Sequence, residues 1–179
     1  MLKRSLTYFF ITCAMLSVAH PVRADEREEA EYRVKAAFIY NFAKFVEWPV
    51  SAFAGPDDPL IFGVLGDDPL IPAFDALRGK KAQGRAVVVR HFSSLDEVKV
   101  CHILLVGRSE QDRLEELIAA FRGAPILLVG DMERFARQGG MIGFVLDRNK
   151  VSFDINAEAC KKARLIVNSQ LLKLANRVY

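Results

Sequence analysis

The sequence predicts an α/β fold with a mostly parallel sheet, an antiparallel C-terminal hairpin at its edge, helices on both faces and a long amphipathic N-terminal helix. Strand-like and helix-like segments alternate four times before the hairpin, as they do in parallel α/β sheets. The run VCHILLV at 100–106 is apolar without alternation, which suits a strand buried on both faces. Two apolar segments, 141–146 and 151–156, flank four turn-forming residues, and this pattern indicates the hairpin.

A secretory leader is expected in front of this domain. Lys3 and Arg4 give a basic start, residues 6–18 are apolar and uncharged, and Val22 and Ala24 offer the small residues that signal peptidase requires. The apolar run is shorter than the ~20 residues of a membrane-spanning helix. We therefore expect a signal peptide at 1–24, cleaved after Ala24, and a single exported domain at 25–179.

Removal of this leader changes the charge balance. Three of the 25 basic residues lie in it, whereas all 22 acidic residues follow it. The domain is then formally neutral, and a basic surface for nucleic acid is not expected.

The first expected helix covers residues 31–48 and ends before Pro49, which cannot continue it. Its predicted outward face includes Lys35. A repeat of ~100° per residue predicts an inward stripe made of Val34, Ala37, Phe38, Phe45 and Trp48. Asn41 falls within this stripe, so its amide is either a satisfied core group or a polar group lining a pocket.

The remaining elements follow in order. After a Gly- and Pro-rich loop at 50–59, Asp68 is the expected N-cap and Pro69 the first residue of a short helix. Asp131 is the expected N-cap of a helix at 132–137, and Gly139-Gly140 would permit a tight turn or a close backbone approach. The other expected segments are strands at 60–65, 86–90, 100–106 and 126–129, helices at 112–121, 157–163 and 170–177 (capped by Ser169), and an extended link at 165–167.

Two strand ends form a candidate ligand site. Asp67-Asp68 and Gly130-Asp131 each follow a predicted parallel strand, at the edge where open α/β sheets bind small molecules. Helices that begin there also present free N–H groups, which favour an anion. Asp67, Asp68, Gly130 and Asp131 are therefore the candidate small-ligand edge.

Two cysteines, Cys101 and Cys160, remain after the leader. In an oxidising compartment they could form a disulfide, which would close a long loop. Two separate buried thiols are the alternative, because the sequence does not supply the distance between the two Cα atoms.

Catalytic patterns are missing from the sequence. It contains no Gly-x-Ser-x-Gly, His-Glu-x-x-His, Cys-x-x-Cys, Gly-x-Gly-x-x-Gly or Walker motif, and the basic turn at 79–85 precedes a strand where a phosphate loop precedes a helix. His91 and His102 have no ligands at metal-like spacing. We expect no catalytic residue, cofactor or metal, and hence a protein that acts by binding.

Five motifs in order along the chain resemble the YfiR family of periplasmic regulators: KAAFIYNFAKFVEWP (35–49), LLVGD (127–131), GGMIGF (139–144), VSFDIN (151–156) and SQLLKLA (169–175). The resemblance implies a periplasmic homodimer that docks on the sensor domain of an inner-membrane diguanylate cyclase and inhibits it. Cyclic-di-GMP and biofilm formation would then fall. It also implies an OmpA-like outer-membrane lipoprotein that sequesters the regulator.

The chain departs from this family in its cysteines. Redox sensitivity in the family goes with two disulfides, whereas only two cysteines follow the leader here. Cys101 matches a family cysteine whose partner is absent, so redox control is not carried over. The alternative function is a periplasmic small-molecule-binding sensor domain whose ligand sets the state of a partner.

Overall fold

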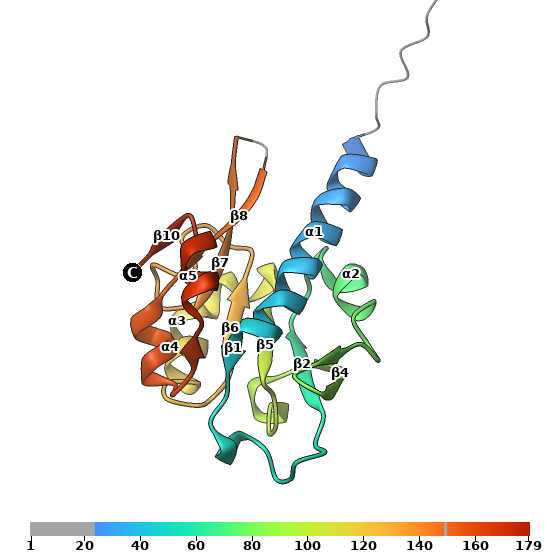
Figure 1. The fold of residues 1–179 in the computed structure, drawn as a ribbon. Coiled ribbons are helices and arrows are strands. Elements are labelled where there is room, and N and C mark those ends of the chain that lie inside the picture. The colour runs from blue at the N-terminus through green and yellow to red at the C-terminus, as the bar shows by residue number, and fades with distance from the viewer. Residues whose placement is uncertain (1–23, 149) are drawn as a thin grey trace, which may run out of the picture.

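The computed structural model describes residues 24–148 and 150–179 (Figure 1), so the predicted leader lies outside the described residues except for Ala24. The helices are α1 (Ala24–Phe45), α2 (Ile71–Asp75), α3 (Leu114–Ala120), α4 (Ala157–Lys162) and α5 (Ser169–Leu174), with 3-10 turns η1 (Val50–Ala52), η2 (Leu95–Glu97) and η3 (Arg108–Arg113). The longer strands are β2 (Leu60–Leu65), β4 (Arg85–Phe92), β5 (Ile103–Val106), β6 (Leu127–Gly130), β7 (Ile142–Asp147) and β8 (Lys150–Ile155). Two-residue strands are β1 (Val46–Glu47), β3 (Lys81–Ala82), β9 (Ile166–Val167) and β10 (Arg177–Val178). None of the described helices is long and apolar enough to cross a membrane.

The predicted mostly parallel sheet with an antiparallel hairpin is confirmed. Among the described residues one sheet has eight strands in the order β10-β8-β7-β6-β5-β2-β4-β3, and β1 pairs separately with β9. Neighbours from β4 to β7 run parallel, whereas β8 is antiparallel to β7 and β3 is antiparallel to β4. The central strands β2, β5 and β6 are buried along their whole length, as their unbroken apolar runs predict.

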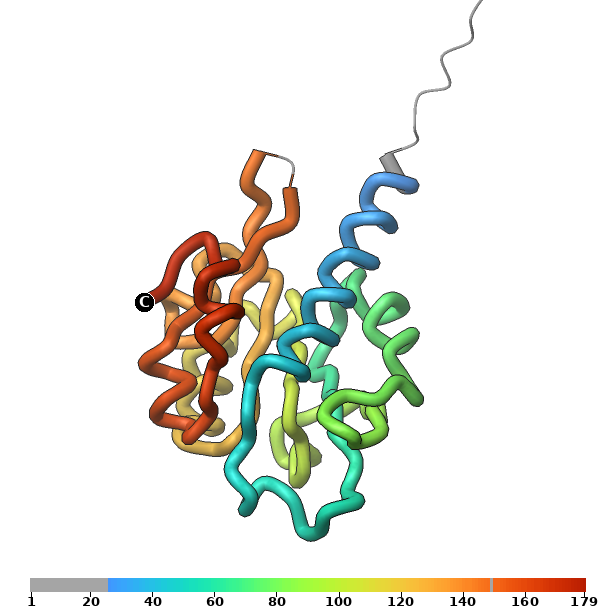
Figure 2. The backbone as a smooth tube through the Cα atoms, in the orientation of Figure 1, coloured from blue at the N-terminus to red at the C-terminus, as the bar shows by residue number. Residues whose placement is uncertain are grey.

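Helices cover both faces of the sheet. Phe144 of β7 and Phe153 of β8 pair across the hairpin and meet Phe42 of α1, with ring centroids 6.0 and 5.0 Å away. Side chains alternate across a strand, so Met141 points to the opposite face, where it lies between α3 and α4. Figure 2 shows the N-terminal turns of α1 and the β7–β8 hairpin rising beyond the sheet on diverging paths.

The long N-terminal helix is confirmed, but the predicted inward stripe is only partly right: Trp48 is buried and Phe38 and Phe45 pack against the core, whereas its other two members are exposed. Val34 is 45% exposed and Ala37 is also exposed, whereas Lys35, expected to face solvent, is buried. The helix also ends at Phe45, because the next two residues form β1 and pair with β9. The buried face of α1 comprises Tyr32, Lys35, Ala36, Ile39, Phe42 and Ala43.

Three cap assignments also differ from the prediction. The α2 helix begins at Ile71, so Asp68 is not its N-cap. Asp68 instead accepts the N–H of Leu70, the residue before the helix, at 2.8 Å. Residues 132–137 form turns rather than a helix, and Arg134 has a positive φ of 60°. Asn168 rather than Ser169 caps α5 by accepting the N–H of Gln170 at 2.8 Å.

The predicted close backbone approach at Gly139-Gly140 is confirmed. A Cβ at Gly140 would lie 2.2 Å from the Phe135 ring, and Gly139 has a φ of +111°. Glycine therefore lets the buried Phe135 ring pack directly against the turn that leads into β7.

Candidate functional site

The carboxyl ends of the parallel strands carry a buried charge cluster, which we call the edge cluster. Asp68 follows β2, Arg108 follows β5 and Asp131 follows β6, so the topology brings all three to one edge. The backbone N–H of Arg108 donates to Asp68 Oδ2 at 3.2 Å, and its guanidinium donates to Asp131. Asp68 and Asp131 therefore lie at one edge of the sheet, and each contacts Arg108.

Helix α1 contacts the edge cluster through the buried side chain of Lys35. Lys35 Nζ donates to Asp131 Oδ2 at 2.8 Å and also pairs with Glu31 one turn earlier. The side chains of Lys35, Asp68 and Asp131 are 4, 0 and 8% exposed. No buried side-chain nitrogen or oxygen among the described residues lacks a hydrogen-bond partner. The cluster therefore fastens α1 to the sheet instead of offering free groups to a ligand.

Burial dominates the electrostatics of this edge. Desolvation raises the pKa of Asp68, opposed by the hydrogen bond from Leu70 and the charge of Arg108. Desolvation and the hydrogen bond to Glu28 raise the pKa of Tyr32, on the neighbouring turn of α1, to about 12.

The other two predicted edge residues, Asp67 and Gly130, contribute no side-chain contact to the edge cluster. Asp67 is exposed and only its backbone contacts Ser109: its N–H donates to Ser109 Oγ at 2.8 Å, and its carbonyl accepts the N–H of Ser109 at 3.3 Å. Gly130 packs against Phe135.

The other sequence candidates lie apart from this edge. Asn41 is partly buried, accepts a hydrogen bond from Lys44 at 3.4 Å and lines none of the cavities described below. Cys101 and Cys160 are buried free thiols, so the candidate disulfide is not formed. Cys101 directly precedes β5, whereas Cys160 lies in α4, which follows β8, and β8 is three strands from β5 in the sheet. Burial raises the pKa of each thiol to about 12, which keeps both in the unreactive protonated form.

An apolar groove, the helix–hairpin groove, opens where α1 and the hairpin diverge. Its volume is about 740 Å³. Leu146 and Val151 are cross-strand partners on the hairpin face that carries Phe144 and Phe153, one step farther from the sheet. The groove thus continues the hydrophobic core outward, and Leu146 is 56% exposed. Its lining is Arg27, Ala30, Glu31, Val34 and Phe38 from α1, with Leu146, Lys150 and Val151 from the hairpin.

The sequence contained a signal for this groove. Val34 and Phe38 belong to the stripe that periodicity assigned to the core, and both line the groove. The apolar residues of α1 occupy two faces of the helix. One face packs against the sheet, and the described residues leave the second face open. Exposed contiguous apolar surface of this kind marks binding sites for other proteins.

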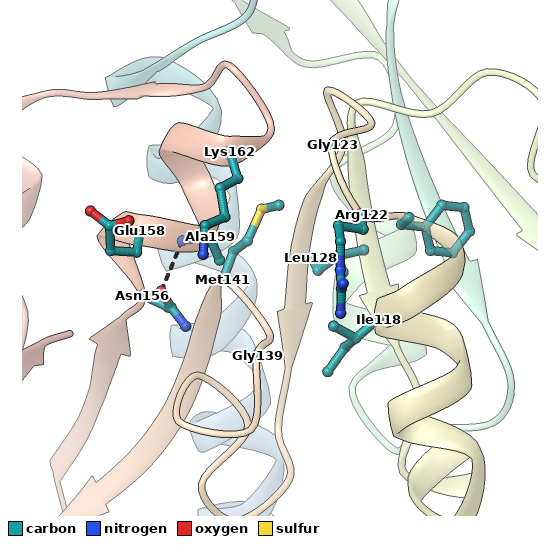
Figure 3. A pocket seen from close by; sticks show the side chains of 11 residues that line it. Ile118, Arg122, Gly123, Leu128, Gly139, Met141, Asn156, Glu158, Ala159 and Lys162 are labelled. Carbon is teal, nitrogen blue, oxygen red and sulfur yellow. Dashed lines mark hydrogen bonds between the residues drawn. The ribbon is translucent and has the colours of Figure 1, made fainter.

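A second cavity, of about 480 Å³, lies between α3 and α4 on the other face of the sheet (Figure 3). Its floor includes Leu128 and Met141, and the charged side chains Arg122, Glu158 and Lys162 stand around it. Asn156 caps α4 here by accepting the N–H of Ala159 at 2.8 Å. No group of three His, Cys, Asp or Glu side chains in the described parts of the chain could hold a metal ion.

The chain is similar to a known protein family and to two solved structures. A family model described as YfiR/HmsC-like matches residues 32–176. A Streptococcus pneumonia structure, titled the ABC domain in complex with L-Trp, aligns with a TM-score of 0.55 and 12% identity. A conserved domain protein from Vibrio cholerae aligns with a TM-score of 0.53 and 12% identity. Each alignment covers 83% of this chain and 60% of the other, which shows a shared fold. No match is found among curated proteins.

Proposed function

This chain belongs to the YfiR/HmsC-like family, and on that premise we propose that it is a non-enzymatic periplasmic regulator. It binds the periplasmic sensor domain of an inner-membrane diguanylate cyclase and inhibits the enzyme. Lower cyclic-di-GMP and reduced biofilm formation are the consequences. The expected leader supports export of the protein, and its family supports its place in this pathway.

The helix–hairpin groove is the observation that carries this proposal. A regulator that acts by contact needs an accessible apolar surface held on rigid elements. Val34 on α1 and Leu146 on the hairpin supply that surface, and both elements are anchored in the same core by Phe42, Phe144 and Phe153. The edge cluster holds α1 in place, so the groove is formed before a partner arrives.

Charged substitutions in the groove test the docking step. We expect Leu146→Glu and Val34→Glu to weaken binding of the purified cyclase sensor domain by roughly tenfold or more, because a carboxylate would be buried against apolar groups. Isothermal titration calorimetry measures the affinity. Ile166→Glu is the matched control, since Ile166 is 64% exposed on β9, outside the groove. Equal affinity of all three variants for the sensor domain would contradict docking through the helix–hairpin groove.

Two further partners belong to the same proposal. An OmpA-like outer-membrane lipoprotein would sequester the regulator and release the cyclase, and the regulator itself would act as a homodimer. The family assignment supports both. Unchanged cyclic-di-GMP after clean deletion of the gene would contradict the whole proposal.

A small-molecule sensor is the second candidate function. The cavity between α3 and α4 favours it, because about 480 Å³ with an apolar floor and a few charged side chains is typical of ligand sites. The streptococcal domain of similar fold was solved with L-Trp, a property of that protein. A thermal-shift screen of amino acids and small carboxylates tests this candidate, because a ligand of the native state raises the melting temperature. Hits abolished by Met141→Trp would place the ligand in this cavity, and a screen without hits would contradict this candidate.

A further inference from the structure

His102 is buried, and the geometry assigns its protonation state. Its Nδ1 lies 3.0 Å from the backbone nitrogen of Ile61, and its Nε2 lies 3.1 Å from the carbonyl oxygen of Ala52. An amide N–H can only donate and a carbonyl can only accept. Nδ1 must therefore be unprotonated and Nε2 must carry the proton, so the imidazole in the folded protein is neutral.

This imidazole holds the connection at residues 49–59, which links the α1 and β1 segment to β2. The ring stacks on Phe53 with centroids 4.5 Å apart and planes 17° apart. The Arg85 guanidinium also packs on Phe53, 3.8 Å from the ring centroid, and donates to the carbonyls of Gly55 and Asp58. The backbone carbonyl of His102 accepts a hydrogen bond from Trp48 Nε1 at 3.1 Å. Both ends of the connection thus converge on one histidine.

We propose that His102 is a pH-sensitive clamp, which fastens the 49–59 connection to the sheet while its imidazole is neutral and releases it on protonation. A proton on Nδ1 would place an N–H donor against the N–H of Ile61, so the hydrogen bond would be lost. It would also bring a second positive charge to the Phe53 ring, beside Arg85. This inference is independent of the helix–hairpin groove.

The surrounding charges act in both directions. Burial lowers the pKa of His102 most, and Arg85 lowers it further, whereas the hydrogen bond to Ala52 and the charge of Asp58 raise it. Arg90 of β4 is a further charged residue on this side, since it and His102 both line a cavity of about 420 Å³ beside the connection. The net direction is below the ordinary value of 6.5.

The sign of the pH effect follows from this direction. The released state, with an ordinary histidine, binds a proton more tightly than the closed state does, so acid favours release. The closed connection has its full stability above about pH 6.5 and loses it progressively below that value. At pH 5.5 the population of the released state should rise by up to about tenfold.

Nuclear magnetic resonance of the full chain tests the clamp. Titration of the wild-type imidazole should place the His102 midpoint below 6.5. In hydrogen exchange, the protection factor of the Ile61 amide should fall by up to about tenfold between pH 7.5 and 5.5. Protection at Leu105, in the middle of β5, should change much less. A His102 midpoint at or above 6.5, or unchanged protection at Ile61, would overturn the proposal without any variant.

Two variants sharpen the test with the fluorescence of Trp48, the single tryptophan of the chain. Its ring centroid lies 6.2 Å from that of His102. The wild type should show an acid fluorescence transition, and His102→Asn, which retains an acceptor for Ile61 but cannot titrate, should lack it. His91→Gln should keep it, because His91 is exposed and pairs with Asp75. Loss of the transition in His91→Gln, or its survival in His102→Asn, would contradict the assignment to His102.

Discussion

A single buried lysine ties the N-terminal helix to the carboxyl edge of the sheet. Lys35 Nζ lies 5.5 Å from the ring centroid of Tyr32 and 6.0 Å from that of Phe144, and it donates to Asp131. A buried cation of this kind is stable only while its counter-charges remain in place. Its partners come from residue 31 on the same helix and from residue 131, far along the chain.

Removal of this charge should weaken the fold. We expect Lys35→Met to lower the free energy of unfolding by about 3 kcal/mol, because Asp131 stays buried with only Arg108 to balance it. Urea unfolding followed by circular dichroism measures the change.

Arg33→Ala is the control for this prediction on the same helix. Arg33 pairs with Glu29, and both side chains are exposed, so the loss should stay within about 1 kcal/mol. Equal effects of the two substitutions would contradict the role given to Lys35.

The candidate edge could be predicted only in part. Asp68 and Asp131 follow strands that are obvious apolar runs, so their meeting at one edge followed from parallel topology. The ion pair between Asp131 and Lys35 could not be predicted, because the contact spans 96 positions and periodicity placed Lys35 on the solvent side. A long-range ion pair leaves no local pattern in a sequence.

At the scale of elements, α1 has two apolar faces with different roles. Phe42 faces the sheet and is fully buried, whereas Val34 lines the helix–hairpin groove. We expect Phe42→Ala to lower the free energy of unfolding by about 3 to 5 kcal/mol, because it leaves a cavity beside Phe144 and Phe153. Val34→Ala should change it by less than about 0.5 kcal/mol.

Thermal or urea unfolding of these two variants decides which stripe of the helix is the core. A larger loss of unfolding free energy in Val34→Ala than in Phe42→Ala would mean that the stripe predicted by periodicity is the core face. It would also contradict the groove as an open surface.

Element types were largely predictable and some boundaries were not. Strands β2, β5 and β6 stand out because both of their faces are buried, and β4 stands out by its run of valines. The predicted helix at 132–137 fails where Arg134 adopts a positive φ and the chain turns tightly around Phe135. The short strand β9 lies within the extended link predicted at 165–167. The strands β1 and β10 form by pairing with distant segments, which two-residue stretches cannot signal.

At the scale of the whole molecule, the two proposed functional features lie at opposite ends of the parallel strands. The helix–hairpin groove rises beyond one end, and the connection held by His102 closes the other (Figure 1). One feature would recognise a partner and the other would respond to pH, with the sheet and the edge cluster between them. Each can therefore be altered without direct contact with the other.

Inhibition of the membrane-bound cyclase by the purified protein tests the central claim most directly. Cyclic-di-GMP synthesis is measured in inner membranes that contain the cyclase, with increasing amounts of wild type, Leu146→Glu or Ile166→Glu. Wild type and Ile166→Glu should inhibit to the same extent, and Leu146→Glu should require roughly tenfold more protein or fail to inhibit. Full inhibition by Leu146→Glu, or none by the wild type, would contradict docking through the helix–hairpin groove.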